Sequence, residues 1–157
     1  MPATYQWSES NLAGENVTDG ITNLNFGSND SVNLNTTTYP ITRGNSSFEK
    51  YIRAKFTDTF TTISNMLFWK SAGSYLTGEA VKAAANVAFV TPSQTPNADA
   101  DVPILVGSAL SIQSAAGTTT ITAPGYTKYC RLQEQTTGST PAGAVNTKTF
   151  TFQWDEV

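Results

Sequence analysis

The sequence contains no histidine. Histidine is the commonest general base of enzymes and the commonest zinc ligand, and a Ser-His triad cannot be built without it. The chain also lacks a GxSxG nucleophile motif, a phosphate-binding P-loop and a CxxC pair. We therefore predict a protein that is not an enzyme, and we expect no catalytic residues, no cofactor and no metal centre.

Cysteine is represented by Cys130 alone, which excludes an intrachain disulfide. A reactive thiol would be the functional interpretation of this residue. However, Cys130 falls in an alternating pattern on the same side as Leu132. We therefore predict that Cys130 is a small buried apolar residue of a strand.

Charged residues make up only 13% of the chain, against roughly 25% in typical soluble domains. The net charge of −3 offers no basic surface to nucleic acid or to an anionic membrane, so we expect neither partner. No apolar run approaches about 18 residues, and the start "MPATYQWSES" has neither the basic nor the apolar part of a signal peptide. These features predict synthesis in the cytoplasm.

Acidic residues form two close pairs, Asp155 with Glu156 and Asp99 with Asp101. Paired carboxylates can hydrolyse glycosidic bonds, but neither pair has the apolar sequence context of a catalytic acid. Asp99 and Asp101 could also converge with Asn97 on a calcium ion. The glycine and the closing glutamate of an EF-hand loop are missing, so the sequence favours an ordinary polar loop.

Threonine, serine, asparagine and aromatic residues take the place of the missing charges, and this composition favours strands. A chain of 157 residues can bury roughly 68–70% of its unfolded surface. We predict an all-β fold, an antiparallel β-sandwich of the jelly-roll or immunoglobulin-like type, with a partly open barrel as the alternative. Residues 1–45 are predicted to form a polar N-terminal arm with short strands, and residues 46–157 the sandwich domain.

Alternating apolar residues predict strands at 48–56 and at 63–69. The second of these is apolar on both sides, so it should be central or covered. Residues 79–89 fit a helix or a strand, and a strand is predicted because Gly78 and Pro92 bound the segment.

Two further segments complete the predicted sandwich. Residues 102–114, "VPILVGSALSIQS", fit either one strand or a helical turn followed by a strand. The last strand, with Phe150, Phe152 and Trp154 in alternation, is predicted to pair with the strand in "YTKYCRLQ" and to bury its aromatic rings.

Tyr51, Arg53 and Lys55 alternate with the apolar residues of the strand at 48–56. Because tyrosine and arginine are enriched at interfaces, this row predicts an outward docking strip, to which Trp7 is added as an interface residue. Exposed rings could instead form a sugar-binding platform, for which the candidates are Trp7, Tyr75, Tyr126 and Tyr129.

Three stretches within residues 46–157 resemble small all-β structural proteins of tailed bacteriophages, of the kind that decorate or cement the capsid. They are "FTTISNMLFWKSAGSYLTG", "APGYTKYCRLQEQTTGSTPAG" and "KTFTFQWDEV". The resemblance implies a non-enzymatic protein of the virion capsid surface, made in the host cytoplasm. Its implied partner is the major capsid protein, and it implies a homo-oligomer, with a trimer favoured. The alternative is a carbohydrate- or receptor-binding β-sandwich module, free or on a phage tail.

Overall fold

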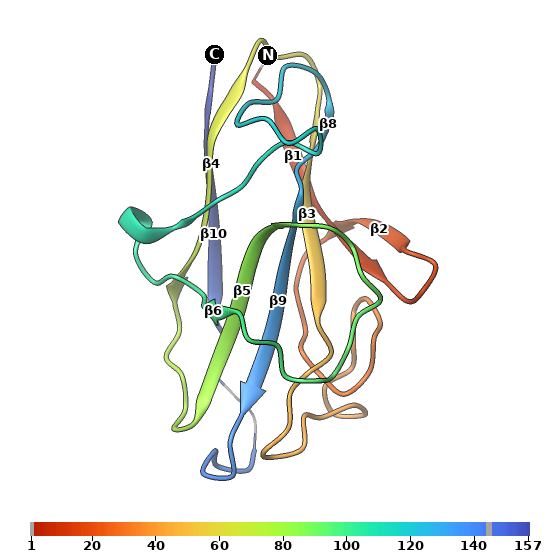
Figure 1. Cartoon of the computed structure of the whole chain (residues 1–157), viewed down its shortest axis with the longest axis vertical. Coiled ribbons are helices and arrows are strands. Elements are labelled where there is room, and N and C mark those ends of the chain that lie inside the picture. The colour runs from red at the N-terminus through yellow and green to blue at the C-terminus, as the bar shows by residue number, and fades with distance from the viewer. Residues whose placement is uncertain (1, 144–145) are drawn as a thin grey trace.

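The computed structural model describes residues 2–143 and 146–157 as two antiparallel sheets (Figure 1). The larger sheet has the order β2-β1-β3-β9-β5-β6, with β8 also paired to β3, and the smaller sheet has the order β10-β4-β7. The elements are β1 Thr4–Asn11, β2 Asn16–Ile21, β3 Lys50–Thr57, β4 Ile63–Ala72, β5 Glu79–Val87, β6 Ala100–Asp101, the 3-10 helix η1 Val106–Ser108, β7 Leu110–Ser111, β8 Gly125–Tyr126, β9 Tyr129–Thr136 and β10 Thr149–Glu156.

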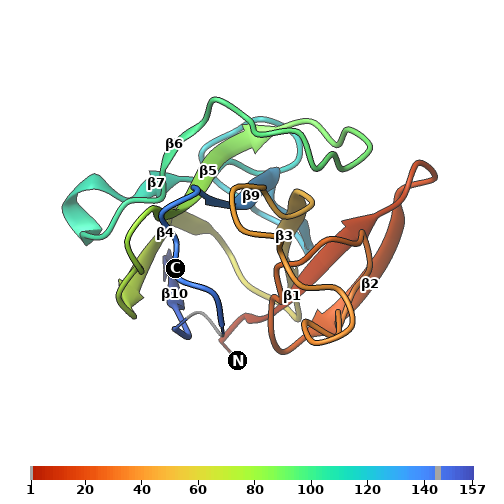
Figure 2. The same ribbon diagram turned by 90° about the horizontal axis from the view of Figure 1, so that it is seen from below.

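The two sheets pack face to face, which confirms the predicted all-β sandwich. Figure 2, which looks along the strands, shows the larger sheet curving around β4 and β10. Side chains that alternate along each strand point into the space between the sheets. The most buried of them are Ile52, Ala54, Phe56, Ile63, Met66, Phe68, Val81, Cys130 and Leu132.

The structure confirms two predictions for the middle of the chain, the central position of the strand at 63–69 and the strand at 79–89. It also decides between the two alternatives for residues 102–114. β4 lies between β10 and β7 in the smaller sheet, as its two apolar sides predict. The segment that fitted both a helix and a strand is the strand β5, whose Val81 and Ala83 face the core. Residues 102–114 form the helical turn η1 followed by the short strand β7.

The predicted partner of the last strand is wrong. β10 pairs with β4, with Phe152 opposite Phe68, and not with β9. β9 is already paired on both sides, with β3 and with β5. The aromatic residues of β10 favour β4 because that strand carries apolar residues on both faces: the rings of Phe150 and Phe68 stack with centroids 5.6 Å apart.

The predicted boundary at residue 45 does not coincide with an edge of the sandwich. β1 pairs with β3 over most of its length, with Trp7 opposite Ala54, and the β1–β2 hairpin extends the larger sheet. The first strands of the chain therefore belong to the sandwich, and residues 22–49, between β2 and β3, form the irregular part.

This irregular segment covers part of the inward face of the larger sheet, the face that also carries Ile52 and Leu132. Lys50 and Glu9 lie beneath it, both 1% exposed, with Nζ 2.8 Å from Oε1. The Lys50 ammonium also donates to the carbonyl of Ser31, and the Asn11 amide bridges Glu9 and Asp30. A buried charge needs such partners, so this network fixes the segment against β1 and β3.

Candidate functional site

Tyr51, which the alternation on β3 predicted to face outward, is fully buried. Its ring lies 5.1 Å from that of Phe89 and 6.0 Å from that of Tyr129. The connection between β5 and β6 crosses this face of the sheet (Figure 1), where the Ser93 carbonyl accepts the Glu49 N–H at 3.0 Å. The expectation that Tyr51 is exposed to a partner is wrong, because a segment distant in sequence covers it.

Arg53 and Lys55 are half-buried and engaged within the chain. The Arg53 guanidinium lies over the rings of Tyr126 and Tyr129, at 3.9 and 4.5 Å from their centroids. Lys55 pairs with Asp19 at 2.5 Å, and this hydrogen bond is the main cause that lowers the pKa of Asp19 and raises the pKa of Lys55. These two side chains tie β3 to β2 and β8.

Trp7 lies between the two sheets. Its ring contacts those of Phe152 and Phe68, with centroids 5.2 and 5.8 Å away, so it joins the sheets rather than marking an outer surface. The other rings considered for a sugar platform are also engaged: Tyr126 and Tyr129 hold Arg53, and Tyr75 lies 4.9 Å from the Lys70 ammonium. These four rings form no exposed platform.

The acidic residues considered for calcium are paired with basic side chains. Asp99 receives two hydrogen bonds from Arg131, at 2.9 and 2.7 Å, and Asp101 pairs with Lys82 at 2.6 Å. Over residues 2–143 and 146–157, no group of three or more histidine, cysteine or acidic side chains is placed to hold a metal ion. This geometry fits the ordinary polar loop that the sequence favoured.

The remaining candidates for chemistry have structural partners. Cys130 is buried in the core, as predicted, and burial raises the pKa of its thiol to about 12. Glu156 accepts the Ala3 N–H with both oxygens, at 2.8 and 2.9 Å, and Asp155 accepts the Asn65 amide. The two terminal carboxylates thus tie β10 to the start of β1 and to β4.

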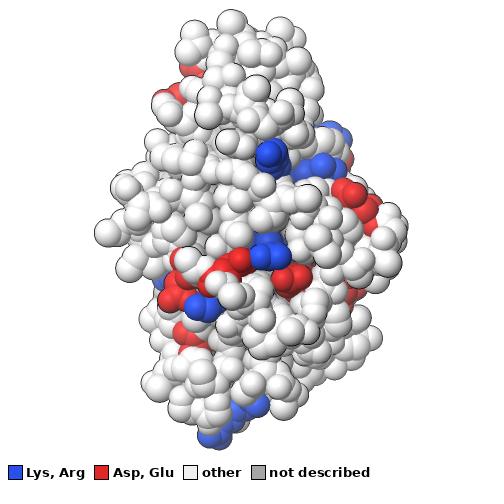
Figure 3. Space-filling view, viewed as in Figure 1, with Lys and Arg blue, Asp and Glu red and all other residues white. Residues whose placement is uncertain are grey.

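A projecting apolar loop is the most prominent surface feature. Ile104, Leu105 and Val106 are consecutive, and their exposed fractions are 61%, 66% and 49%. Residues 103–108, here called the 103–108 loop, extend away from both sheets (Figure 1) and carry no charged side chain (Figure 3). From the sequence, these residues were expected to form a strand or a helical turn, and they were not proposed as a binding surface. Their run of consecutive apolar residues, which does not alternate with polar ones, is the signal that could have indicated such a surface.

Both ends of the 103–108 loop are held by the sheets: its start bonds to β5 and β4, and it runs on into β7, which pairs with β4. The Val102 N–H donates to the Val81 carbonyl, and the Pro103 carbonyl accepts the Lys70 N–H, both at 2.8 Å. Val102 itself is 2% exposed. The loop is therefore presented on a fixed base, which lowers the entropy cost of ordering it in a complex.

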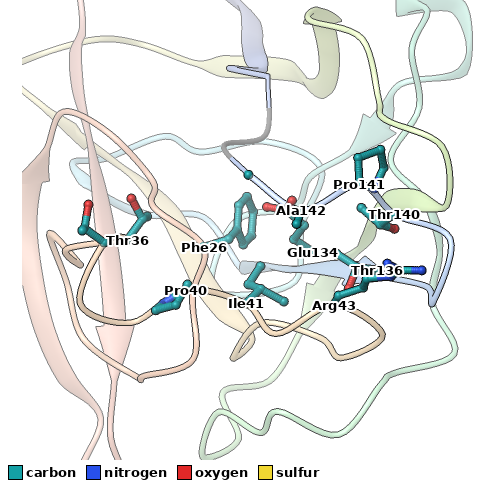
Figure 4. Close-up of a pocket in the computed structure, with 12 residues that line it drawn as sticks. Phe26, Thr36, Pro40, Ile41, Arg43, Glu134, Thr136, Thr140, Pro141 and Ala142 are labelled. Carbon is teal, nitrogen blue, oxygen red and sulfur yellow. The ribbon is translucent and has the colours of Figure 1, made fainter.

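A second feature is a cavity of about 490 Å³ at the end of the sandwich, here called the Glu134 cavity (Figure 4). Glu134 lies on β9 and shares the inward side of that strand with Cys130 and Leu132. Its exposed fraction is 2%, and burial raises the pKa of its carboxyl to about 7. The alternation Cys130, Leu132, Glu134 could have revealed this inward acid, but sequence reasoning missed it.

Comparisons with protein-family models, with curated proteins and with solved structures find no match to this chain. Among the helical residues that the structure describes, none belongs to a helix long and apolar enough to cross a membrane.

Proposed function

We propose that the chain is a non-enzymatic structural protein that binds a protein surface through the 103–108 loop. The observation that carries the proposal is the run of three exposed apolar side chains, Ile104, Leu105 and Val106, on a fixed base. Apolar side chains that project together into solvent mark interaction sites, because their burial in a partner is favourable.

The resemblance to phage proteins supplies the identity of the partner. On that basis the chain is a capsid decoration or cement protein that binds and stabilises the lattice of the major capsid protein. It is made in the host cytoplasm, and it acts on the capsid surface of the virion. Copies associate as a homo-oligomer, with a trimer favoured by the threefold positions that such a lattice offers.

Burial of one such side chain contributes roughly 1.5–3 kcal/mol, so a single loop gives a modest affinity. Oligomerisation multiplies this affinity, since the second and third loops bind at a high effective concentration. The loop carries no charge, and therefore we expect the contact to depend little on salt concentration.

The test is co-sedimentation of the full chain with expanded capsids assembled from the major capsid protein encoded in the same genome. We expect saturable binding and a higher capsid disruption temperature. Leu105→Glu should weaken binding by about 10- to 100-fold, the equivalent of one apolar side chain. Val90→Glu is the matched control, since Val90 is 59% exposed and lies outside the loop.

Three outcomes contradict the proposal in different ways. If the wild-type chain does not sediment with capsids, the assignment to the virion is wrong. If Leu105→Glu and Val90→Glu bind equally well, the 103–108 loop is not the contact. If the isolated chain binds glycans and no capsid, the carbohydrate-binding alternative replaces the proposal. Circular dichroism of each variant should match the wild type, because exposed substitutions change stability by only about 0.5 kcal/mol.

A further inference from the structure

The Glu134 cavity contains a buried carboxyl group whose hydrogen-bonding capacity is not used. Glu134 is 2% exposed, and its Oε1 atom has no hydrogen-bond partner among the described residues. An unpaired buried acceptor destabilises the fold, and more so when it is charged. A ligand that donates hydrogen bonds to this oxygen would remove that destabilisation.

We propose that the Glu134 cavity binds a primary ammonium group carried on a short apolar chain. Such a group belongs to free alkylamines and to lysine side chains of other polypeptides. This function is independent of the capsid contact proposed above, because the 103–108 loop contributes no residue to the cavity.

The electrostatic surroundings of Glu134 favour a cation as the ligand. Arg43 is the one basic residue that lines the described part of the cavity. It is exposed, its Nε donates to the carbonyl of Gly138, and its side chain extends away from the Glu134 carboxyl (Figure 4). The negative charge is therefore left uncompensated, and an ammonium group supplies both a positive charge and three N–H donors.

The walls of the cavity fit a hydrocarbon chain attached to that ammonium. Phe26 lies on the side toward which the Glu134 carboxyl points (Figure 4), so its ring face can attract the cation. The other apolar walls are Pro40, Ile41, Pro141 and Ala142. A metal ion fits less well, since Glu134 is the single carboxylate in the described lining and divalent cations take several oxygen ligands.

Binding of an ammonium should depend on pH. Burial raises the pKa of Glu134 to about 7, so at pH 6 most of the carboxyl groups hold a proton that the cation must displace. The nearby ionisable groups include Arg43 and Tyr75, and burial raises the pKa of Tyr75 to about 12. Lys148 and Glu79 pair with each other. Burial lowers the pKa of Lys148 to about 8, but Lys148 does not line the cavity. Among the described lining groups, Glu134 is therefore the one whose charge changes between pH 6 and 8, and the pentylamine affinity should rise by about tenfold over this range.

The test is isothermal titration of the full chain with pentylamine and, as the uncharged isostere, with pentan-1-ol. We expect pentylamine to bind, pentan-1-ol to bind at least about tenfold more weakly, and the pentylamine affinity to rise from pH 6 to pH 8. Glu134→Gln should abolish both the preference and the pH dependence. Glu156→Gln is the control, because that carboxylate is exposed and lies on β10.

The source of the ammonium is resolved by comparing N-acetyl-lysine methylamide with its norleucine analogue. If the lysine derivative binds, the ligand is a lysine side chain of another polypeptide. If pentylamine binds and the lysine derivative does not, the ligand is a free amine. The proposal is overturned if pentylamine and pentan-1-ol bind equally, if neither binds, or if folded Glu134→Gln binds pentylamine as tightly as the wild type. Each of these results leaves the capsid test unaffected.

Discussion

Lys50 and Glu9 form an ion pair that is closed to solvent, with Nζ and Oε1 2.8 Å apart and 1% of each side chain exposed. Lys50→Met should leave the Glu9 carboxylate buried without its cation. We expect the free energy of unfolding to fall by about 3–5 kcal/mol, as measured by urea denaturation.

The double variant Glu9→Met/Lys50→Met is the control for this first prediction. Because it leaves no unpaired charge, it should be more stable than Lys50→Met alone. If the double variant is the less stable of the two, the pair is not acting through mutual charge compensation.

The stability of the fold should decrease as the pH rises from about 5 to 8. The pKa of Glu134 is about 7 in the folded chain against an ordinary value of 4.5, so the folded chain retains a proton that the unfolded chain loses. The stabilising contribution is complete below the unfolded pKa and is lost as the pH passes through the folded pKa. The full loss is about 3 kcal/mol.

Urea denaturation of wild type and Glu134→Gln at pH 5 and pH 8 measures this effect. The Gln variant should show a much smaller loss, whereas Glu156→Gln should lose stability in parallel with the wild type. Equal pH dependence in wild type and Glu134→Gln would mean that Glu134 titrates normally.

Phe152 should be among the most important side chains of the inter-sheet core. It is 8% exposed, and its ring lies 5.2 Å from Trp7 and 5.4 Å from Tyr5. Phe152→Ala should lower the free energy of unfolding by about 3–5 kcal/mol, through lost burial and the cavity left behind. Val157→Ala, at a position that is 80% exposed, should change stability by less than about 0.5 kcal/mol. Similar thermal transitions for both variants would contradict this role of β10.

Cys130 should be inert in the folded chain. Its side chain is 0% exposed, and burial raises the pKa of the thiol to about 12, so almost no thiolate is present at pH 8. Modification by a disulfide reagent should proceed only through unfolding, and it should be complete in denaturant. Rapid labelling of the native protein at pH 8 would show that the thiol is accessible.

The alternation of apolar and polar residues in the sequence was enough to predict where most of the long strands lie. The period-two pattern located β3, β4, β5, β9 and β10 and placed Cys130 in the core, because a pleated strand turns successive side chains to opposite faces. The pairing of β10 with β4 was not predictable in this way, since the choice between two apolar partner strands depends on the whole sheet order.

The candidate site was less predictable, for a related reason. Tyr51 and Arg53 have the alternation of a solvent-facing row, but segments distant in sequence cover them. Phe89 covers Tyr51, and Tyr126 and Tyr129 lie against Arg53. Glu134 looks like one more polar residue in "RLQEQ", and its importance comes from the depth of the position rather than from its neighbours in sequence.

The position of β3 between β1 and β9 has a consequence for how the chain folds. Ile52 pairs with Glu9 on one side and with Cys130 on the other, so the central strand meets partners about 40 and about 80 residues away. Pairings of such long range make folding slow, typically milliseconds to seconds. During translation β9 leaves the ribosome long after β3, and until then β3 has an open edge that is prone to pair with another chain.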